Sequence, residues 1–159
     1  MQAIRTTGIC FGLRTLIVVY VDGLCEPVNP GGIATYGYVI RDETDGRTLA
    51  RRSGLVGRGP EMSNNVAEYA ALVEALQTLV TQGKTGEKIE VRGDSKLVIN
   101  QMSGNWKFHQ GLYGDKYRKA KVLTVQFPQI SFKWVPREEN EEADSLTREA
   151  YDRATGSSI

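Results

Sequence analysis

Leu16-Ile-Val-Val-Tyr-Val-Asp22-Gly-Leu-Cys25 is the stretch from which the fold can be worked out. Residues 16–21 are apolar and mostly β-branched, which is typical of a central strand buried on both faces. The run is too short to cross a membrane. A buried carboxylate is costly unless it is paired or binds a metal, so Asp22, which ends or interrupts this strand, is a candidate functional residue. The alternative is a hairpin turn with Asp22 and Gly23 at its corner.

Length and charge limit the classes of protein that the chain can represent. It has 159 residues and a formal net charge of +1, which suits one domain and gives no overall attraction to nucleic acid or to a membrane. A site for a polyanion must therefore be a local patch or use bound cations. We find no membrane-spanning stretch and no secretory signal, so a cytoplasmic location is expected. Cys10 and Cys25 lack the spacing of metal ligands and are expected to be free thiols.

Hydrophobic periodicity and turn signals predict the other elements. Strands are expected over 33–41 and 47–57, on either side of a turn at 42–46, and form a meander with the first strand. The elements expected after the meander are a helix over 63–82, a strand over 88–92, a short helix ending near residue 102, a helix over 112–126, a strand over 130–134 and a helix over 138–153. This order predicts an α/β fold with a mixed sheet and helices on both faces. We divide the chain into an N-terminal extension (1–14), one domain (15–153) and a polar C-terminal tail (154–159).

Four acidic residues stand out at separate positions: Asp22, Glu68, Asp94 and Asp144. Each has a structural alternative. Glu68 follows Asn65 by three residues, and the pair could form a helix-capping box. Asp94 precedes a helix and could be its N-cap. Asp144 lies on a polar helix face and could be a solvated surface acid.

Six motifs that contain or adjoin these acids follow one another along the chain. They are Tyr20-Val-Asp22-Gly, Asn29-Pro-Gly-Gly32, Ser63-Asn-Asn65-Val-Ala-Glu68, Gly93-Asp94-Ser95, Gly104-Asn-Trp106-Lys and Trp134-Val-Pro-Arg137-Glu-Glu-Asn140-Glu-Glu-Ala-Asp144. In order and approximate spacing they resemble type 1 ribonuclease H, and most of all its archaeal-style branch. The resemblance covers about residues 15–153. One such motif would be weak evidence, whereas six in the right order are strong.

The resemblance implies a fold, a reaction and a metal site. The fold is a five-stranded mixed sheet of order 3-2-1-4-5, with the first three strands antiparallel and helices on both faces. The reaction is hydrolysis of the RNA strand of an RNA–DNA hybrid, leaving 5′-phosphate and 3′-hydroxyl ends. The family's metal-binding acids fall on Asp22, Glu68, Asp94 and Asp144, which would hold two divalent cations about 4 Å apart. Hard oxygen ligands favour Mg²⁺, and Mn²⁺ is an expected substitute. By resemblance, Asp22 bridges both ions.

The resemblance also implies the residues that bind the substrate. A protein distinguishes RNA from DNA through the 2′-hydroxyl, reached across the minor groove. Asn29, Asn64 and Asn65 match the family's polar contacts there, because an amide both donates and accepts. Turn and cap chemistry is their alternative role. Ser95, next to Asp94, is included in the same substrate-binding set.

Two further substrate contacts are expected in the segment that follows the short helix. Trp106 could stack on a deoxyribose of the DNA strand or, alternatively, could be a core aromatic. Lys107 and the other basic residues of 107–121 could contact phosphates of that strand, or could simply form a solvated face. No obligate protein partner is evident, and a monomer is expected.

The chain departs from the family pattern in the loop before the last acid. Many members carry a histidine there, whereas this chain has Pro136-Arg137. His109 lies in another segment and is not expected to replace that histidine. Arg137 is included in the catalytic set as a cation near the metals or the leaving product. Its alternative is a surface ion pair with Glu141 at i, i+4.

Other functions stay open on the sequence alone. Transposases, integrases and 3′–5′ exonucleases share the fold and the acid cluster, so the fold does not decide the substrate. Double-stranded RNA is a possible secondary substrate. Outside the enzymes, the alternative is a catalytically silent nucleic-acid-binding module of the same fold, although four retained acids argue against it.

Overall fold

A computed structural model describes residues 15–156. The elements in chain order are β1 (Leu16–Glu26), β2 (Ile33–Asp42), β3 (Arg47–Arg58), α2 (Asn64–Thr81), β4 (Lys88–Gly93), α3 (Lys96–Met102), α4 (Gly114–Thr124), β5 (Ile130–Trp134), the 3₁₀ turn η1 (Arg137–Glu139) and α5 (Glu141–Thr155). The N-terminal extension 1–14 lies outside the described residues, as does part of the expected polar tail. Because α5 includes residues 154 and 155, it runs further than the helix expected over 138–153.

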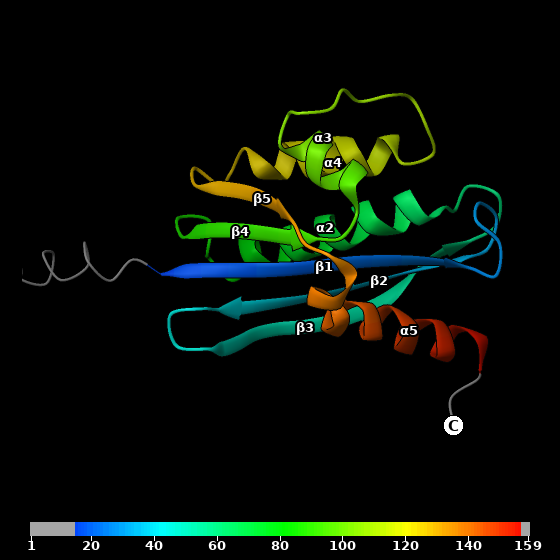
Figure 1. Ribbon diagram of the computed structural model, residues 1–159, viewed down its shortest axis with the longest axis horizontal. Coiled ribbons are helices and arrows are strands. Elements are labelled where there is room, and N and C mark those ends of the chain that lie inside the picture. The colour runs from blue at the N-terminus through cyan, green and yellow to red at the C-terminus, as the bar shows by residue number, and fades with distance from the viewer. Residues whose placement is uncertain (1–14, 157–159) are drawn as a thin grey trace, which may run out of the picture.

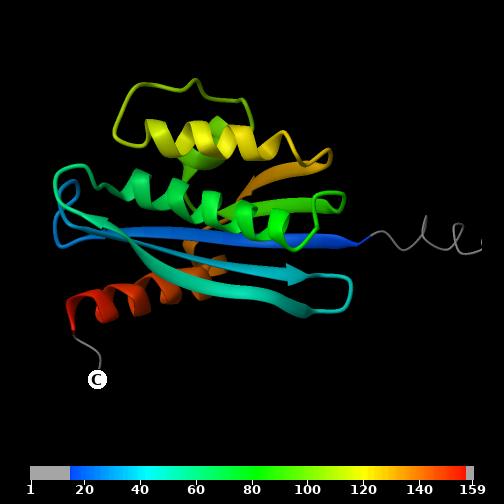
Figure 2. The same ribbon diagram turned by 180° about the vertical axis from the view of Figure 1, so that it is seen from behind.

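The strands form one mixed sheet between two layers of helices. Its order is β3-β2-β1-β4-β5. β1 pairs antiparallel with β2 and parallel with β4, and β5 continues the parallel half. α5 lies in front of the sheet in Figure 1, and α2 crosses its other face in the view from behind (Figure 2). The expected fold class and strand order are confirmed.

β1 lies at the centre of the sheet and is longer than the apolar run suggested. Ile17, Val18, Val19 and Val21 are almost wholly buried, as expected of a strand covered on both faces. The strand continues to Glu26, and its antiparallel pairing with β2 is unbroken through Asp22 and Gly23. The alternative of a hairpin turn at Asp22-Gly23 is therefore wrong, and Asp22 lies within the strand rather than at its end.

The main core lies between the sheet and α2. Ile17, Val19 and Val21 of β1 pack with Ile89 and Val91 of β4 against the buried side of the helix. The buried side of α2 is broader than the single stripe expected from helical spacing, since every residue from 66 to 72 is buried. Such wide burial fixes α2 firmly on the sheet, and with it any side chain that α2 directs toward β1. Within residues 15–156, no helix is both long and apolar enough to span a membrane.

Helix starts differ from the sequence interpretation at functionally relevant places. Ser63 caps α2 by accepting a hydrogen bond from the Val66 backbone N at 3.1 Å, so the capping box between Asn65 and Glu68 is wrong. Ser95, and not Asp94, caps α3 in the same way. Both acids are therefore free of the capping roles that were their structural alternatives.

The last two helices are shorter at their starts than expected. α5 begins at residue 141 rather than 138, because Asn140 departs from helical backbone geometry and its side-chain amide donates to the Val21 carbonyl at 2.8 Å. α4 spans 114–124 rather than 112–126. Tyr113, just before it, is held by ring stacking on Tyr69 and by a hydrogen bond from Gln101 Nε2 to its hydroxyl.

Candidate active site

Three carboxylates from separate elements converge at the centre of the sheet. Asp22 of β1, Glu68 of α2 and Asp94 after β4 each offer an oxygen, and these oxygens all lie within 4.8 Å of one another. Asp22 and Glu68 are each only 5% exposed, and the Asp94 side chain is 10% exposed. Burial of three acids together is unfavourable without a cation, because each charged form loses hydration and repels the others.

Asp144 joins this cluster from the opposite layer of helices. It lies on the first turn of α5, and its carboxyl group is a hydrogen-bonding neighbour of the Asp22 carboxyl. It is half-buried and not the fully solvated acid of the alternative interpretation. A polar cavity of about 150 Å³ is lined by Asp22, Gly23, Leu24, Cys25, Glu26, Asn64, Glu68, Arg137, Asp144 and Arg148.

Two glycines let the helices come close enough to bring the acids together. A Cβ at Gly23 would overlap the α2 backbone at Ala67 and Glu68. A Cβ at Gly37, which pairs with Asp22 across the β1–β2 ladder, would lie 2.7 Å from the Ala143 carbonyl oxygen of α5. The strand positions nearest Asp22 therefore lack side chains where α2 and α5 must pack, and Glu68 and Asp144 reach Asp22 as a result.

Two hydrogen bonds hold backbone carbonyls beside the acids. Asn140 donates from Nδ2 to the carbonyl of Val21, one residue before Asp22, at 2.8 Å. Trp134 donates from Nε1 to the carbonyl of Asp94 at 3.1 Å. Sequence patterns indicate no role for either donor, and the only available signal is that both belong to the last motif.

Burial and mutual repulsion change the proton affinity of the cluster. Desolvation, followed by the charge of Asp94 and by the hydrogen bond and charge of Asp144, raises the pKa of Asp22 from 3.8 to about 8. Desolvation, followed by the charges of Asp22 and Asp94, raises the pKa of Glu68 well above its usual range, while Arg137 opposes the rise. The protein thus holds carboxylates that bind protons tightly when no other cation neutralises them.

The donor set fits hard divalent cations. All the converging ligands are carboxylate oxygens, which suit Mg²⁺ or Mn²⁺ and offer none of the sulfur or nitrogen donors that softer metals prefer. A cation would also offset the repulsion that raises the Asp22 and Glu68 pKa values. The cluster could therefore hold a divalent metal.

Arg137 borders the cluster, whereas His109 does not. The Arg137 Nε lies 3.8 Å from Asp94 Oδ2, and its side chain is 78% exposed. No ion pair joins Arg137 to Glu141 within residues 15–156, so that alternative is not supported. His109 is exposed in the loop between α3 and α4 and does not line the polar cavity.

The predicted asparagines lie together at the start of α2. Asn64 lines the cavity, and its Nδ2 lies 3.4 Å from Glu68 Oε2. Asn29 accepts a hydrogen bond from the Asn64 backbone N through its side-chain oxygen at 2.8 Å, so part of its polar capacity serves local structure. Asn65 is half-buried. Ser95 serves as the α3 cap, accepting a hydrogen bond from Val98 N.

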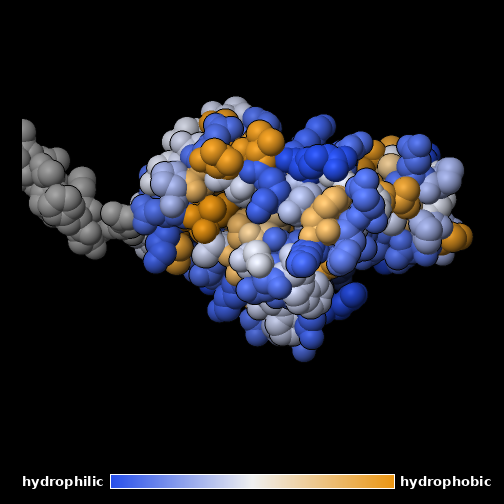
Figure 3. Space-filling model, turned by 90° about the horizontal axis from the view of Figure 1, so that it is seen from above, coloured by the Kyte–Doolittle hydropathy of each residue, from blue (hydrophilic) through white to orange (hydrophobic). Residues whose placement is uncertain are grey.

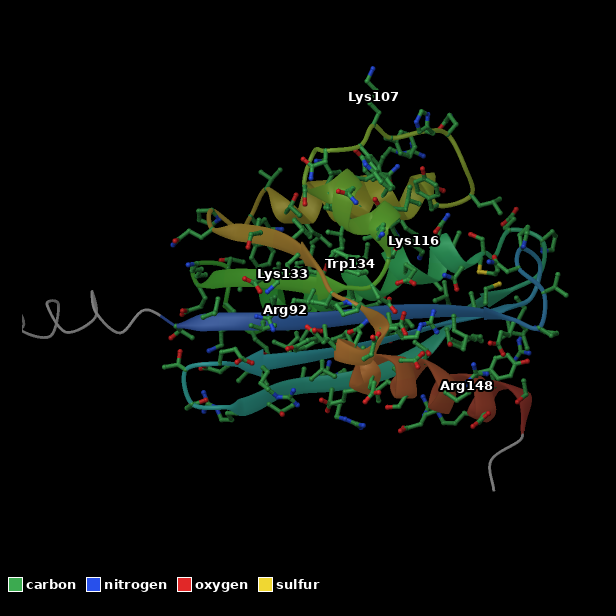
Figure 4. All side chains as sticks on the ribbon, viewed as in Figure 1. Arg92, Lys107, Lys116, Lys133, Trp134 and Arg148 are labelled. Atoms are coloured by element: carbon green, nitrogen blue, oxygen red, sulfur yellow. The ribbon has the colours of Figure 1, made fainter. Side chains whose placement is uncertain are left out.

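Trp106 and Lys107 lie on the loop between α3 and α4, apart from the acids. Trp106 is 48% exposed, so the alternative of a core aromatic is wrong. Lys107 points away from the fold at the tip of the loop (Figure 4). Figure 3 views the molecule from the side of α3, α4 and this loop, and shows hydrophilic residues over much of the face with hydrophobic ones in separate groups.

An ion pair at the edge of the cavity could not be found from sequence spacing. Arg148 of α5 donates to both carboxylate oxygens of Glu26 at 2.8 and 2.9 Å, joining residues 122 positions apart. The one available signal was that Arg148 lies a helical turn after Asp144. Its hydrogen bonds to Glu26, with its charge as a smaller cause, stabilise the ionised carboxyl and lower the pKa of Glu26.

Comparisons with known proteins agree with this geometry. The sequence model of the family described as reverse transcriptase-like matches residues 21–150. The bifunctional protein Rv2228c of Mycobacterium tuberculosis is 39% identical over 141 residues, which are 89% of this chain and 37% of that protein. Ribonuclease HI of Halobacterium salinarum is 38% identical over 85% of this chain and 64% of its own length. The chain thus spans about a third to two thirds of these relatives.

Solved structures share the fold of this chain. The N-terminal RNase H domain of Rv2228c matches with a TM-score of 0.80 and 37% identity, covering 91% of this chain and 99% of that one. LC11-RNase H1 in complex with an RNA/DNA hybrid matches with a TM-score of 0.78 and 37% identity, covering 87% of this chain and 99% of that one. The family match over residues 21–150 includes all four acids of the cluster.

Proposed function

The chain belongs to the reverse transcriptase-like family and is similar to ribonuclease HI, and from this we propose that it is an endoribonuclease for the RNA strand of RNA–DNA hybrids. One observation carries the proposal above all others. Carboxylates from β1, α2 and α5 line one polar cavity bordered by Asn64 and two arginines, and the Asp94 carboxylate of the β4–α3 turn lies within 4.8 Å of those of Asp22 and Glu68. Such a site suits hydrolysis of a phosphodiester, whose charge the metals and arginines would balance.

Asp22, Glu68 and Asp94 would hold one Mg²⁺, and Asp22 with Asp144 a second. Bound in this way, the ions would supply Lewis-acid stabilisation of the phosphate and a water of lowered pKa. Mn²⁺ offers the same preference for oxygen ligands and is the proposed substitute. The protein's own part is to keep four carboxylates at fixed positions by packing α2 and α5 on the glycines of the central strands.

The residues around the cluster would orient the substrate. Arg137, beside Asp94, would place a positive charge near the phosphate or the departing product, in the position where many relatives carry histidine. Asn29, Asn64 and Asn65, with Ser95, would contact the hybrid from the minor-groove side, where the 2′-hydroxyl marks the RNA strand.

The loop residues would contact the other strand. Trp106 is an exposed ring that can stack on a sugar, and Lys107 is an exposed cation that can meet a phosphate without regard to sequence. LC11-RNase H1, of similar structure, was solved with an RNA/DNA hybrid, which supports this choice of ligand. The cytoplasmic location and the monomeric state stay predictions.

The experiment is a comparison of four end-labelled substrates with Mg²⁺, Mn²⁺ or EDTA: an RNA–DNA hybrid, single-stranded RNA, double-stranded RNA and double-stranded DNA. The proposal expects metal-dependent cutting of the RNA in the hybrid, with 5′-phosphate and 3′-hydroxyl ends. Weaker cutting of double-stranded RNA would identify a secondary activity. Cutting of DNA would overturn the proposed substrate. Binding of the hybrid without cutting would favour the catalytically silent module.

A further inference from the structure

Trp134 is an exposed aromatic residue directly beside the carboxylate cluster. It ends β5, is 41% exposed and pairs in register with Gly93, the residue before Asp94. Its indole N–H is used by the Asp94 carbonyl, which fixes the orientation of the ring. A rigid, half-exposed ring at this position forms a platform on the surface next to the acids.

Two lysines without an acidic partner lie near this platform, Lys96 over the ring and Lys133 on the opposite face of β5. Lys96, the first residue of α3, places its Nζ 5.1 Å from the centre of the Trp134 ring, a separation at which a cation is attracted to an aromatic face. Lys133 precedes Trp134 and is exposed. Within residues 15–156, neither lysine forms an ion pair with a carboxylate. Both charges are therefore available to an external anion.

Arg92 is a third cation near Trp134, but its charge is already balanced by an acid. It lies beside Lys133 in the β4–β5 register, and Figure 4 shows the two side chains close to Trp134. However, its Nε lies 2.6 Å from a Glu90 oxygen, and its other end donates to the Tyr20 hydroxyl. Glu90 largely neutralises Arg92, so the net positive charge of this surface comes from Lys96 and Lys133.

The position of these residues relative to the acids follows from the sheet. Val21, Gly93 and Trp134 lie in one row across β1, β4 and β5, so Trp134 is two strands, or roughly 10 Å, from Val21, the residue that precedes Asp22. A nucleic-acid strand advances about 3.4 Å along the duplex axis per phosphate, and the distance between successive phosphates is larger than this rise. The patch is thus within about three nucleotides of a phosphate held at the cluster.

The charges around the cluster and the open edge of the sheet favour a path over β5 for a bound polyanion. Glu138, Glu139 and Glu141 gather around a separate cavity beside Tyr20, where they would repel phosphates. Glu142, which also lines it, is paired with Arg41 and Arg51. β5 is an edge strand, so no further strand covers its outer side. Lys133 and Trp134 are also well separated from Lys107 and Arg148 (Figure 4), so the two lysines extend the basic surface in a new direction.

We propose that Lys96, Lys133 and Trp134, here called the β5 patch, bind backbone phosphates of the hybrid within about three nucleotides of the cleaved bond. This inference rests on the proposed function, because it takes the hybrid as the ligand of the cluster. Lys96 and Lys133 would each neutralise a phosphate, and Trp134 would hold Lys96 in place. The contact is to the backbone and is therefore independent of base sequence.

The test compares two double variants in hybrid binding. Lys96→Ala/Lys133→Ala removes the patch, and Lys84→Ala/Lys88→Ala removes equal charge at the other end of β4. Both are made with Asp22→Asn, so that the substrate is not cut, and affinity is measured by fluorescence anisotropy over a range of salt. Loss of two phosphate contacts lowers the slope of log K against log salt by roughly 1.8. We expect this change, and at least a tenfold weaker binding at low salt, only in the patch variant.

A second measurement locates the contact. Hybrids in which one position is cleavable are shortened base pair by base pair from either end. The patch variant should bind worse than its parent when the hybrid extends about three base pairs beyond that position on one side, and as well as its parent when the hybrid ends at that position on the same side. Equal effects of both double variants, or an effect that does not depend on hybrid length, would overturn the inference.

The two proposals fail in different ways. If the wild type cuts the hybrid but the patch variant binds as the control does, the β5 patch is wrong and the proposed function stands. If the wild type cuts no hybrid but binding still depends on Lys96 and Lys133, the proposed activity is wrong and the patch as a nucleic-acid contact stands.

Discussion

Replacing Asp22 by asparagine should make the metal-free protein more stable at pH 8 while removing a central carboxylate. In the wild type, burial and the neighbouring acids raise the pKa of Asp22 from 3.8 to about 8. The folded state therefore binds this proton more tightly than the unfolded chain. The tighter binding of this proton stabilises the folded state fully below about pH 4, and this stabilisation is lost as the pH rises toward 8.

The magnitude follows from the size of that shift. Each pH unit between the two pKa values changes the free energy of unfolding by about 1.4 kcal/mol, so the step from pH 5 to pH 8 removes on the order of 4 kcal/mol. Glu68 adds an effect of the same sign, because its pKa is also raised by burial and by Asp22. Asp22→Asn abolishes the pH-dependent contribution of Asp22 to the free energy of unfolding and lessens that of Glu68.

Urea denaturation in EDTA between pH 5 and pH 8 measures this dependence. Glu149→Gln, an exposed position on α5, is the matched control and should behave as the wild type does. Mg²⁺ at 100 times its Kd should raise the free energy of unfolding of the wild type by about 2.7 kcal/mol at pH 8, and that of Asp22→Asn by less. A wild-type urea midpoint that changes with neither pH nor Mg²⁺ would refute a preformed carboxylate cluster.

Three further tests address single parts of the site. Arg137→Ala should slow hybrid turnover at least tenfold while His109→Ala leaves it unchanged, and the opposite result would show that the two roles are reversed. Gly23→Ala should lower the free energy of unfolding by about 3 kcal/mol or more, because its Cβ would overlap the α2 backbone; an unchanged urea midpoint would contradict that close packing. Asn140→Ala should cost about 1–3 kcal/mol, because the buried Val21 carbonyl loses its donor, and a thermal midpoint equal to that of the wild type would count against this role.

Local patterns predicted most of the fold because most helices and strands have sequence signals that extend over only a few residues. The apolar run of β1 identified the central strand, and the helical spacing on α2 placed that helix within one residue at each end. The continuation of β1 past Asp22 could not be seen locally. Gly23 resembles a turn residue in sequence, whereas its lack of a side chain actually serves the packing of α2 against the strand.

The candidate site was predicted in part for the same reason. The four acids lie in recognisable motifs, and the structure brings their carboxyl groups together. The donors that hold the neighbouring backbone were missed, because Asn140 reaches Val21 across 119 residues and Trp134 reaches Asp94 across 40. The Arg148–Glu26 pair was missed likewise. Contacts of this kind depend on the register of strands and helices, which short sequence patterns do not contain.

The most direct test of the central claim is cleavage of an end-labelled RNA–DNA hybrid by the wild type and by Asp22→Asn, side by side, with Mg²⁺ and with EDTA. The carboxylate cluster as the catalytic centre predicts that the wild type cuts the RNA strand only with Mg²⁺. Asp22→Asn, folded and still able to bind the hybrid, should show at least a thousandfold lower rate, about 4 kcal/mol in activation free energy. Cleavage by Asp22→Asn at a rate near that of the wild type would contradict the assignment.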